Sequence, residues 1–310
     1  MKVLITDDVH ILLIEGLQQM GFEVVFRPDI SFEETLAAIE PFTGLIINSK
    51  IFCGPELLDK APKLKWIGRL GSGMEVIDRA ACDARGVKYF NSPEGNRNAV
   101  AEHALGLLLN LMNNITKSNN EVKAGKWIRE PNRGEELSGK TVGIIAFGNT
   151  GEAFAKILSG FDVQILAYDK YKSGFGNEAV KESSLEEIFE KADIVSLHLP
   201  LTDETKYMVD ESFLNSFRKP IYLINTSRGK VLKTTALLSA IRSGKVKAAA
   251  MDVLENEKIA QLNAQEQEWF DALCKEERII LTPHIAGWTI ESKRKIAEVV
   301  LSTLKGFRTL

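Results

Sequence analysis

The sequence predicts an α/β protein built from two parallel-sheet domains. Three features lead to this prediction. Apolar, β-rich runs alternate with helical patterns through the second half, the first half repeats the alternation on a smaller scale, and a long apolar segment separates the halves. Continuous apolar strands that alternate with helices are typical of a parallel sheet covered on both faces. A chain of 310 residues is long for one hydrophobic core and suits two.

The first half carries five short candidate strands. They are "KVLIT" (2–6), "FEVVF" (22–26), "GLIIN" (44–48), "LKWIGRL" (64–70) and "VKYFN" (87–91). Five short strands with helices between them predict a flavodoxin-like sheet.

Two long helical segments set the expected domain boundaries. The segment "NRNAVAEHALGLLLNLMNNI" (96–115) is apolar nearly all round, which predicts a buried helix at the hinge. The segment after His284, "IAGWTIESKRKIAEVVLSTLKGF", predicts a second long helix that returns to the first domain. We therefore expect a discontinuous first domain, 1–96 completed by 286–310, and a second domain over 97–285.

The second half carries six candidate strands, the number of a doubly wound, Rossmann-like sheet. They are "TVGIIAF" (141–147), "VQILAYD" (163–169), "DIVSLHL" (193–199), "IYLINTS" (221–227), "KAAAMDV" (247–253) and "RIILTPH" (278–284). Two helix boundaries between them have clear signals. Ser184 and Glu187 have the spacing of a capping box, and Gly244 is a natural helix stop.

The turn after the first of these strands resembles a phosphate-binding loop. The usual pattern is G-x-G-x-x-G, and this chain has Ala146, Gly148 and Gly151 at the three glycine positions. Gly148 would let the backbone approach a pyrophosphate, and Gly151 would let the helix pack on the strand. Alanine suits the first position if its φ is negative and not if its φ is positive. A plain strand-to-helix turn is the alternative.

Asp169 strengthens the interpretation of this loop. It ends the next strand, 21 residues after Gly148, where a carboxylate would bind both ribose hydroxyls of a dinucleotide. A carboxylate at that place favours NAD and repels a 2′-phosphate, although Lys170 and Lys172 leave some use of NADP open. The alternative for Asp169 is a turn residue. Strand count, loop and spacing together predict an NAD-binding domain.

Composition argues against several other classes of protein. The net charge of −3 predicts no nucleic-acid partner and no attraction to an anionic membrane. Cys53, Cys82 and Cys274 lie far apart, so we expect neither a metal site nor a disulfide framework, and we expect a cytoplasmic protein. The N-terminus lacks a secretory pattern, and "ALGLLLNLM" (104–112) is too short to span a bilayer.

Three polar side chains follow strands of the second sheet. Arg228 follows the fourth, Glu257 comes shortly after the fifth, and His284 ends the sixth. The carboxyl ends of parallel strands face the ligand crevice, so we expect these groups to meet there. Singly, His284 would more often be structural, and Arg228 and Glu257 could be a solvated loop pair.

Together these groups suit the oxidation of an alcohol beside a carboxylate, or the reduction of the corresponding keto group. Arg228 would clamp the substrate carboxylate and polarise the carbonyl. His284 would take the hydroxyl proton as hydride leaves and return it in the reverse direction. Glu257 would bond the imidazole and raise its pKa.

The other histidines are expected to be structural. His103 lies within the apolar helix, and His10 has no companion residue. His198 ends a strand just before Leu199 and Pro200, near the expected rim of the cofactor site. We predict a supporting role for it there.

The motifs of the whole chain resemble the D-isomer-specific 2-hydroxyacid dehydrogenases. They are "GSGMEVID" (71–78), "NRNAVAEHALGLLL" (96–109), the Ala146 loop, "VSLHLPLT", "NTSRGKV", "MDVLENE" and "TPHIAG". Their order and spacing are more specific than any one of them. Within the family, "GKWIREPNRGEELSGKTVGII" is most similar to the short-form D-3-phosphoglycerate dehydrogenases.

The resemblance implies roles for individual residues. Arg228, Glu257 and His284 would be catalytic. The residues implied to contact or line the NAD site are Ser72, Gly148, Asn149, Thr150, Gly151, Asp169, His198, Leu199, Pro200, Thr226, Ser227, Arg228, Asp252, His284 and Gly287, with Asp252 near the nicotinamide amide. The backbone of Gly71–Gly73 would bind the substrate carboxylate. No metal is implied.

The sequence departs from the family pattern at three places, and the departures at Asn48 and Met74 concern the substrate. Ala146 replaces a glycine, and Asn48 in "IINSKIF" stands where an arginine is usual. Met74-Glu75 in "GSGMEVID" stands where a small or branched residue followed by Asp is usual. A substrate phosphate would need cations. The candidate substrate-binding residues are Asn48, Ser49, Lys50, Arg69, Gly71, Ser72, Gly73 and Arg129, the last from the same chain or from a partner subunit of an expected homodimer.

The expected function is NAD-dependent oxidation of a D-2-hydroxy acid to the 2-keto acid, and the reverse. The first candidate substrate is 3-phosphoglycerate, oxidised to 3-phosphohydroxypyruvate in serine biosynthesis. Glyoxylate/hydroxypyruvate reduction and D-lactate oxidation are alternatives. A non-catalytic, NAD(H)-sensing protein similar to a corepressor is a further alternative from a different class.

Overall fold

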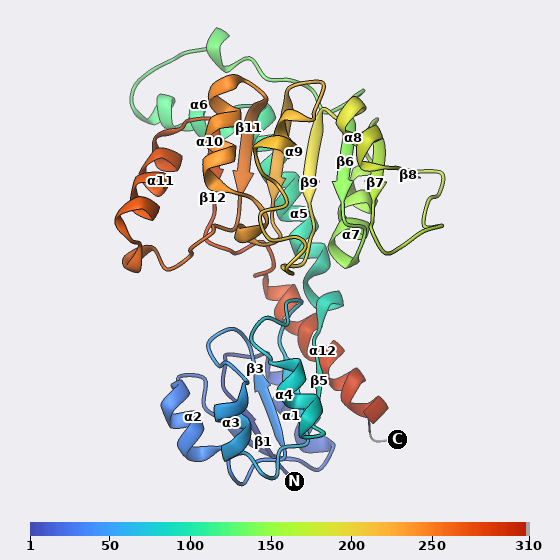
Figure 1. Ribbon diagram of the computed structural model, residues 1–310, viewed down its shortest axis with the longest axis vertical. Coiled ribbons are helices and arrows are strands. Elements are labelled where there is room, and N and C mark those ends of the chain that lie inside the picture. The colour runs from blue at the N-terminus through green and yellow to red at the C-terminus, as the bar shows by residue number, and fades with distance from the viewer. Residues whose placement is uncertain (308–310) are drawn as a thin grey trace. The chain divides into compact units, whose positions relative to one another are not determined.

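The protein contains two compact α/β units. The computed structural model describes residues 1–307. The first unit comprises Met1–Arg97 and the chain from Trp288 on, and the second comprises Asn98–Gly287. The sequence placed these boundaries after residues 96 and 285, one and two residues earlier. Each unit has a central parallel sheet with helices on both faces (Figure 1).

The first unit has a five-stranded parallel sheet in the order β2-β1-β3-β4-β5. The strands are β1 (Lys2–Ile5), β2 (Glu23–Phe26), β3 (Gly44–Ile47), β4 (Trp66–Arg69) and β5 (Lys88–Phe90). This is the flavodoxin-like order that the five apolar runs predict. Each observed strand lies within its predicted run.

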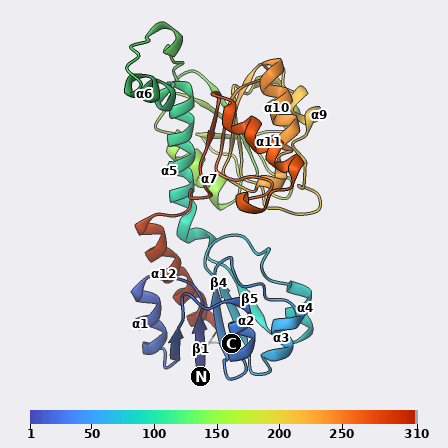
Figure 2. The ribbon, with the colours of Figure 1, turned by 90° about the vertical axis from the view of Figure 1, so that its left-hand side faces the viewer.

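Helices cover both faces of this sheet (Figure 2). On one face lie α1 (Ile11–Gln19) and α12 (Ile290–Phe307), which share a core with Val3, Ile5 and Ile46. On the other lie α2 (Phe32–Ala38), α3 (Pro55–Lys60) and α4 (Arg79–Ala84). Helices α1 and α12 approach closely at Gly16, where a methyl group would lie 2.4 Å from a carbon of Leu301.

The second unit has a seven-stranded parallel sheet in the order β12-β11-β10-β9-β6-β7-β8. The strands are β6 (Thr141–Ile145), β7 (Gln164–Tyr168), β8 (Val180–Glu182), β9 (Ile194–Leu197), β10 (Ile221–Asn225), β11 (Val246–Met251) and β12 (Ile279–Leu281). The order reverses between β6 and β9, as in doubly wound nucleotide-binding folds. The sequence predicted six of these strands and missed β8, an edge strand in which Val180 alone is buried.

Two layers of helices cover this sheet (Figure 2). On one face lie α5 (Pro93–Met112) and α7 (Asn149–Leu158). On the other lie α8 (Leu185–Lys191), α9 (Glu211–Asn215), α10 (Thr234–Ser243) and α11 (Ala264–Lys275). Short 3₁₀ turns occur at η1 (Glu130–Asn132), η2 (Gly229–Val231) and η3 (Ile259–Gln261). Within residues 1–307, no helix has the length and apolar character needed to cross a bilayer.

Helix α5 corrects one prediction about burial. Its residues Ala101, Ala104 and Leu108 are fully buried against the sheet, but Glu102 and Gly106 are exposed. The helix therefore buries one face, whereas the sequence predicted burial nearly all round. The boundary between the units falls within its first turns, after Arg97.

Of the two predicted helix boundaries, the start of α8 is confirmed in part and the end of α10 is confirmed in full. Ser184 caps α8 by accepting a hydrogen bond from Glu187 N at 3.2 Å. The Glu187 side chain does not complete the capping box and instead pairs with Lys181 and Lys191. These hydrogen bonds lower the pKa of Glu187 to about 2. Helix α10 ends at Gly244 with φ +78°, as predicted.

Residues 113–134 form an arm that includes α6 (Ile115–Lys123) and η1. Glu135 fixes its base, since this carboxylate accepts hydrogen bonds from Lys247 at 2.8 Å and from the Tyr222 hydroxyl at 3.2 Å. The bond from Lys247 lowers the pKa of Glu135. Tyr222 and Lys247 are each the second residue of their strand, so the base of the arm lies at the amino ends of β10 and β11.

Candidate active site

The candidate catalytic groups of the second unit follow neighbouring strands at the carboxyl edge of its sheet. Arg228 follows β10, Glu257 follows β11 and His284 follows β12. These three strands are adjacent and parallel. The sheet therefore delivers all three segments to one edge, which is where doubly wound folds bind ligands.

His284 and Glu257 form a direct hydrogen bond. Imidazole Nδ1 lies 2.9 Å from Glu257 Oε2, and both side chains are about half exposed, at 47% and 45%. A carboxylate only accepts, so Nδ1 donates and the ring has its Nε2 lone pair directed elsewhere. His284 has φ +57°, a left-handed conformation that is rare for a residue with a Cβ.

Arg228 is presented by a turn that Asn225 organises. The buried Asn225 side chain accepts from Ser227 N at 3.0 Å and from the Ser227 hydroxyl at 2.7 Å, and it donates to Arg228 O at 3.1 Å. The Arg228 guanidinium donates to Ser227 O at 2.7 Å. Asn225 is not among the site residues predicted from the sequence. Its signal is an Asn at a strand end, two residues before a Ser, which is typical of an Asx turn.

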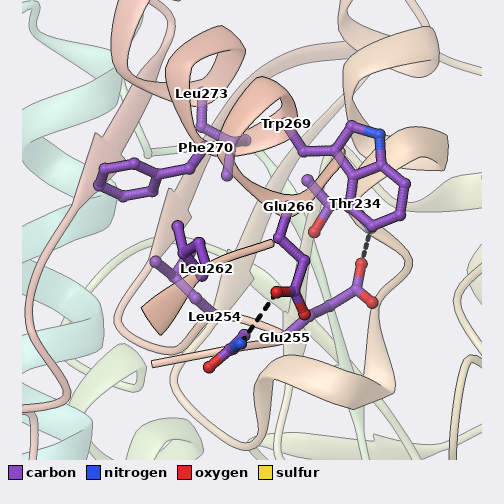
Figure 3. A pocket seen from close by; sticks show the side chains of 9 residues that line it. Thr234, Leu254, Glu255, Leu262, Glu266, Trp269, Phe270 and Leu273 are labelled. Atoms are coloured by element: carbon purple, nitrogen blue, oxygen red, sulfur yellow. Dashed lines mark hydrogen bonds between the residues drawn. The ribbon is translucent and has the colours of Figure 1, made fainter. Parts of the chain in front are cut away.

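The loops that carry Arg228 and Glu257 interlock. Glu255 Oε1 accepts a hydrogen bond from Thr234 N at 2.5 Å, and Asn256 Nδ2 donates to Glu266 Oε2 at 3.2 Å. Figure 3 shows the small pocket that these groups line, with the apolar side chains of Leu254, Leu262, Trp269, Phe270 and Leu273 around it. The segment that leads to Glu257 is therefore fixed to the start of α10 and to α11.

The phosphate-binding loop contains a strained residue. Ala146 has φ +71°, so the expectation that alanine requires a negative φ at this position is wrong. The turn has the backbone that a glycine would adopt, and the β-carbon costs about 1–2 kcal/mol in that region. Ala146 N donates to Tyr168 O at 2.8 Å, which joins the turn to the end of β7.

The two glycines of this loop meet different needs. A methyl group on Gly151 would lie 2.4 Å from Ala146 O, so this glycine permits close packing of α7 on the turn. A methyl group on Gly148 would meet no atom within 4 Å, and its φ of −94° is open to any residue. The place that a side chain would occupy at Gly148 is therefore open, beside the start of α7. Helix α7 begins there without a side-chain cap, which suits an anion.

Asp169 is engaged by its own turn. Its carboxylate accepts from Phe147 N at 2.8 Å, from Tyr171 N at 2.9 Å and from Lys172 N at 3.0 Å. Asp169 therefore does act as a turn residue, which was the alternative to ribose binding. One acceptor position of its carboxylate remains for a ribose. Lys170 and Lys172 pair with Glu204 and Glu152.

His198 is a buried neutral link between β9 and α7. It is 8% exposed, with one ring nitrogen 2.9 Å from Ser196 Oγ and the other 3.2 Å from Thr150 Oγ1. Burial lowers the pKa of His198 to about 4. The next residues, Leu199 and Pro200, are half-buried and exposed at the same strand end.

Further predicted cofactor residues lie at the same edge. Thr226 and Ser227 are 9% and 7% exposed, and Thr226 Oγ1 is buried without a hydrogen-bond partner in the protein. Asp252 is 1% exposed at the end of β11, and Gly287 ends the second unit. The orphaned hydroxyl, the open space at Gly148 and the uncapped α7 together fit a bound dinucleotide.

In the first unit, the predicted substrate residues follow β3 and β4. Asn48 and Arg69 lie at neighbouring strand ends, since Ile47 and Arg69 are register partners. Asn48 N donates to Asp7 Oδ2 at 2.9 Å, and Ser49 is exposed. The Lys50 ammonium donates to Pro28 O, so its charge is directed to the backbone of its own unit.

The loop from Gly71 to Gly73 is tied to the segment after β5. Gly71 N donates to Ser92 Oγ at 2.8 Å, and Ser72 Oγ donates to Asn96 Oδ1 at 3.1 Å. Gly71 has φ +119°, and a methyl group there would lie 2.0 Å from an Arg69 nitrogen. The Arg69 guanidinium thus lies across this loop. Met74 packs on the core of its unit.

Arg129 is not brought to the carboxyl edge of its own unit. It is exposed on the arm, whose base lies at the amino ends of β10 and β11. Arg228 and His284 follow the opposite ends of strands in that sheet. Across the described residues 1–307, no group of three or more His, Cys, Asp or Glu side chains is arranged to hold a metal ion.

The fold and site define a class of protein. A doubly wound sheet, a glycine-containing turn at the start of α7 and a histidine–carboxylate pair at the carboxyl edge are typical of dinucleotide-dependent dehydrogenases. Residues 105–286 match the family model described as "D-isomer specific 2-hydroxyacid dehydrogenase, NAD binding domain". The chain belongs to the D-isomer-specific 2-hydroxyacid dehydrogenase family.

Individual relatives differ in their named substrates. The chain is 32% identical over 312 residues to a D-3-phosphoglycerate dehydrogenase of Archaeoglobus fulgidus. This match covers 99% of this chain and 58% of that protein. It is 36% identical over 287 residues to a glyoxylate reductase of Thermofilum pendens, with 89% and 82% coverage. The solved D-lactate dehydrogenase of Aquifex aeolicus, complexed with NAD and lactic acid, matches with a TM-score of 0.84 at 26% identity, covering 100% of this chain and 96% of that one. The chain thus spans less than two thirds of the phosphoglycerate dehydrogenase relative.

Proposed function

We propose that this protein is an NAD-dependent dehydrogenase that interconverts a D-2-hydroxy acid and the corresponding 2-keto acid. The observation that carries the proposal is the 2.9 Å hydrogen bond between His284 Nδ1 and Glu257 Oε2. This pair lies at the sheet edge that also bears Arg228. Family membership supports the reaction class.

His284 is assigned the proton transfer. Because Glu257 accepts from Nδ1–H, Nε2 is the nitrogen that takes the substrate hydroxyl proton during oxidation. Glu257 stabilises the imidazolium that forms and fixes the orientation of the ring. In the reductive direction, Nε2–H returns the proton to the carbonyl oxygen.

Arg228 is assigned the substrate carboxylate and the polarisation of the reacting carbonyl. A guanidinium offers two parallel N–H groups to a carboxylate, which orients the acid as well as binding it. The turn made by Asn225 sets the backbone from which Arg228 projects. In the first unit, we assign the backbone N–H groups of Gly71–Gly73 to the substrate carboxylate, as the family resemblance implies.

NAD would be held by the residues around α7 and by the ends of the neighbouring strands. The pyrophosphate is assigned to the backbone at Gly148, Asn149 and Thr150, and a ribose to Asp169. When bound, the nicotinamide ring accepts or donates the hydride. Lys170 and Lys172 are paired with Glu204 and Glu152. Because both ammonium groups already have carboxylate partners, their pairing supports NAD over NADP, whose 2′-phosphate would need a cation.

Two substrates are candidates, each with its own support. The phosphoglycerate dehydrogenase relative and the Arg69 guanidinium across the Gly71 loop support 3-phosphoglycerate and a place in serine biosynthesis. The second candidate is glyoxylate or hydroxypyruvate. Lys50 is directed to Pro28 O and Arg129 lies on the arm, so fewer cations remain for a phosphate. The relative with 36% identity is a glyoxylate reductase.

We further propose a homodimer in the cytoplasm. Ile115, Val122 and Trp127 on the arm are large apolar side chains with 52%, 50% and 82% exposure, a pattern that favours an interface with a second copy. All three cysteines of the chain are free thiols, which suits a reducing compartment.

A screen of NADH consumption tests the proposal. Phosphohydroxypyruvate, hydroxypyruvate, glyoxylate and pyruvate are each offered with NADH and, in parallel, with NADPH. We expect turnover of at least one with NADH, and loss of most turnover in His284→Ala while NADH still binds. His10→Asn, which keeps a helix-capping side chain, is the control histidine replacement and should retain activity. Tight NADH binding with no turnover of any acid would contradict the proposal and indicate a sensor.

A further inference from the structure

The buried carboxylate of Asp252 holds the turn that presents His284. Its Oδ1 accepts from Ile285 N at 2.9 Å and its Oδ2 from Ala286 N at 2.8 Å. Its main-chain oxygen accepts from His284 N at 2.7 Å. Asp252, at the end of β11, thus accepts hydrogen bonds from the N–H groups of three consecutive residues, 284 to 286.

We call these three hydrogen bonds, from the N–H groups of residues 284 to 286 to Asp252, the clamp on the turn. They are needed because the backbone of the turn is strained. His284 has φ +57°, a left-handed conformation that is unfavourable for a residue with a Cβ. A residue stays in that region only when surrounding contacts impose it. Weakening the Asp252 contacts would let the backbone relax and would move the imidazole away from Glu257.

A hydrogen-bond chain reaches this carboxylate from α5. The Thr282 hydroxyl donates to Asp252 Oδ1 at 2.5 Å. Thr282 Oγ1 lies 3.1 Å from His103 Nε2, and since its own proton is committed to Asp252, it accepts from Nε2–H. His103 Nε2 is also 3.6 Å from Asp252 Oδ1. Asp252 is 1% exposed, so its side-chain oxygens depend on hydrogen-bond donors within the protein, such as the Thr282 hydroxyl.

We propose that His103 is a positioning residue for the reaction. Through Thr282 it orients the Asp252 carboxylate, and Asp252 in turn fixes the backbone of residues 284–286. The inference rests on the proposed function for its kinetic consequence, but the clamp on the turn is independent of any activity. It replaces the purely structural role that the apolar surroundings of His103 suggested from sequence.

The test compares His103→Leu, which removes the donor, with His103→Gln, whose amide can donate to Thr282. Two measurements are made on the full chain: kcat with the best acid of the screen, and amide hydrogen exchange of a peptide that covers 282–287. We expect His103→Leu to lower kcat by about 100-fold, the effect of a misplacement near 1 Å. We also expect faster exchange confined to that peptide, with both effects largely reversed in His103→Gln. Thr282→Val should reproduce His103→Leu, and the double variant should be no worse than either single one.

Glu102→Gln, the exposed neighbour on α5, is the matched control and should change neither measurement. Unchanged exchange and kcat in His103→Leu would overturn the proposal. Faster exchange spread evenly over the second unit would also overturn it, because that pattern indicates a general packing role. If the wild type turns over no acid, the proposed function fails, and the exchange at 282–287 still decides whether the clamp exists.

Discussion

The α-carbon of Gly229 packs directly on the peptide between Leu254 and Glu255. A methyl group built on this glycine would lie 1.8 Å from Leu254 O and 2.7 Å from Glu255 N. Gly229 follows Arg228, and Leu254 precedes Glu257 by three residues. The loops that carry the guanidinium and the carboxylate of the candidate site therefore touch through their backbones, and neither can move far without the other.

Gly229→Ala should disturb both loops at once. The obstacle is backbone, which cannot rotate away, so one loop must shift. We expect the free energy of unfolding to fall by about 1–3 kcal/mol, as for other overpacked sites, and kcat/KM to fall by about 100-fold. Urea unfolding and steady-state kinetics measure the two effects. Gly106→Ala is the control, since a methyl group there meets nothing within 4 Å on the exposed side of α5. Normal kinetics in Gly229→Ala would show that the loops tolerate displacement.

Arg228→Lys should weaken use of the acid and leave NADH binding intact. An ammonium is a point charge and cannot reproduce the planar pair of N–H groups that a carboxylate accepts. We expect kcat/KM for the acid to fall by about 100-fold, the scale seen when one fixed donor to a reacting oxygen is lost. Fluorescence titration of NADH should give an unchanged Kd. Arg242→Lys, exposed in the last turn of α10, is the matched control. An unaltered kcat/KM in Arg228→Lys would remove Arg228 from the substrate site.

The sheets were predictable because their strands are runs of apolar residues that the alternating helices separate. The exception, β8, has a single buried residue, Val180, and so lacks the pattern. The ends of α8 and α10 were predictable from Ser184 and Gly244, whose effects are local.

Features that depend on distant contacts were not predictable. The left-handed φ of Ala146 follows from packing against α7 and β7, which the local sequence does not specify. His103 and Thr282 are 179 residues apart, and no spacing rule relates them. The strand ends bearing Arg228, Glu257 and His284 were predictable, because parallel strands share one carboxyl edge, but the turns that orient these side chains were not.

Ala146→Gly should stabilise the second unit. Relief of the left-handed strain is worth about 1–2 kcal/mol, and the added freedom of glycine in the unfolded chain offsets about 0.5–1 kcal/mol of it. We expect a net gain near 0.5–1 kcal/mol in the free energy of unfolding, measured by urea denaturation. Gly151→Ala is the contrasting variant and should be destabilising, since its methyl group would lie 2.4 Å from Ala146 O. A less stable Ala146→Gly protein would mean that the alanine makes contacts that outweigh its strain.

His198 gives the second unit a defined dependence on pH. Burial lowers the pKa of this imidazole from the ordinary 6.5 to about 4. Between these values the unfolded chain binds a proton at His198 and the folded chain does not, so stability rises with pH across this window. The contribution is fully present above about pH 6.5 and is lost as the pH falls toward 4. A shift of this size corresponds to roughly 3 kcal/mol.

His198→Gln should remove that slope, because glutamine is neutral in both states. We expect the variant to be less stable than wild type at pH 7, since Ser196 and Thr150 lose an imidazole partner, and the difference to shrink as the pH falls from 6.5 to 4. Urea unfolding at pH 7, 5.5 and 4.5 measures it. Thr150→Val, which keeps the buried histidine, is the control and should keep the wild-type slope. Parallel curves for wild type and His198→Gln would mean that the ring is protonated in the folded protein, against the neutral link between β9 and α7.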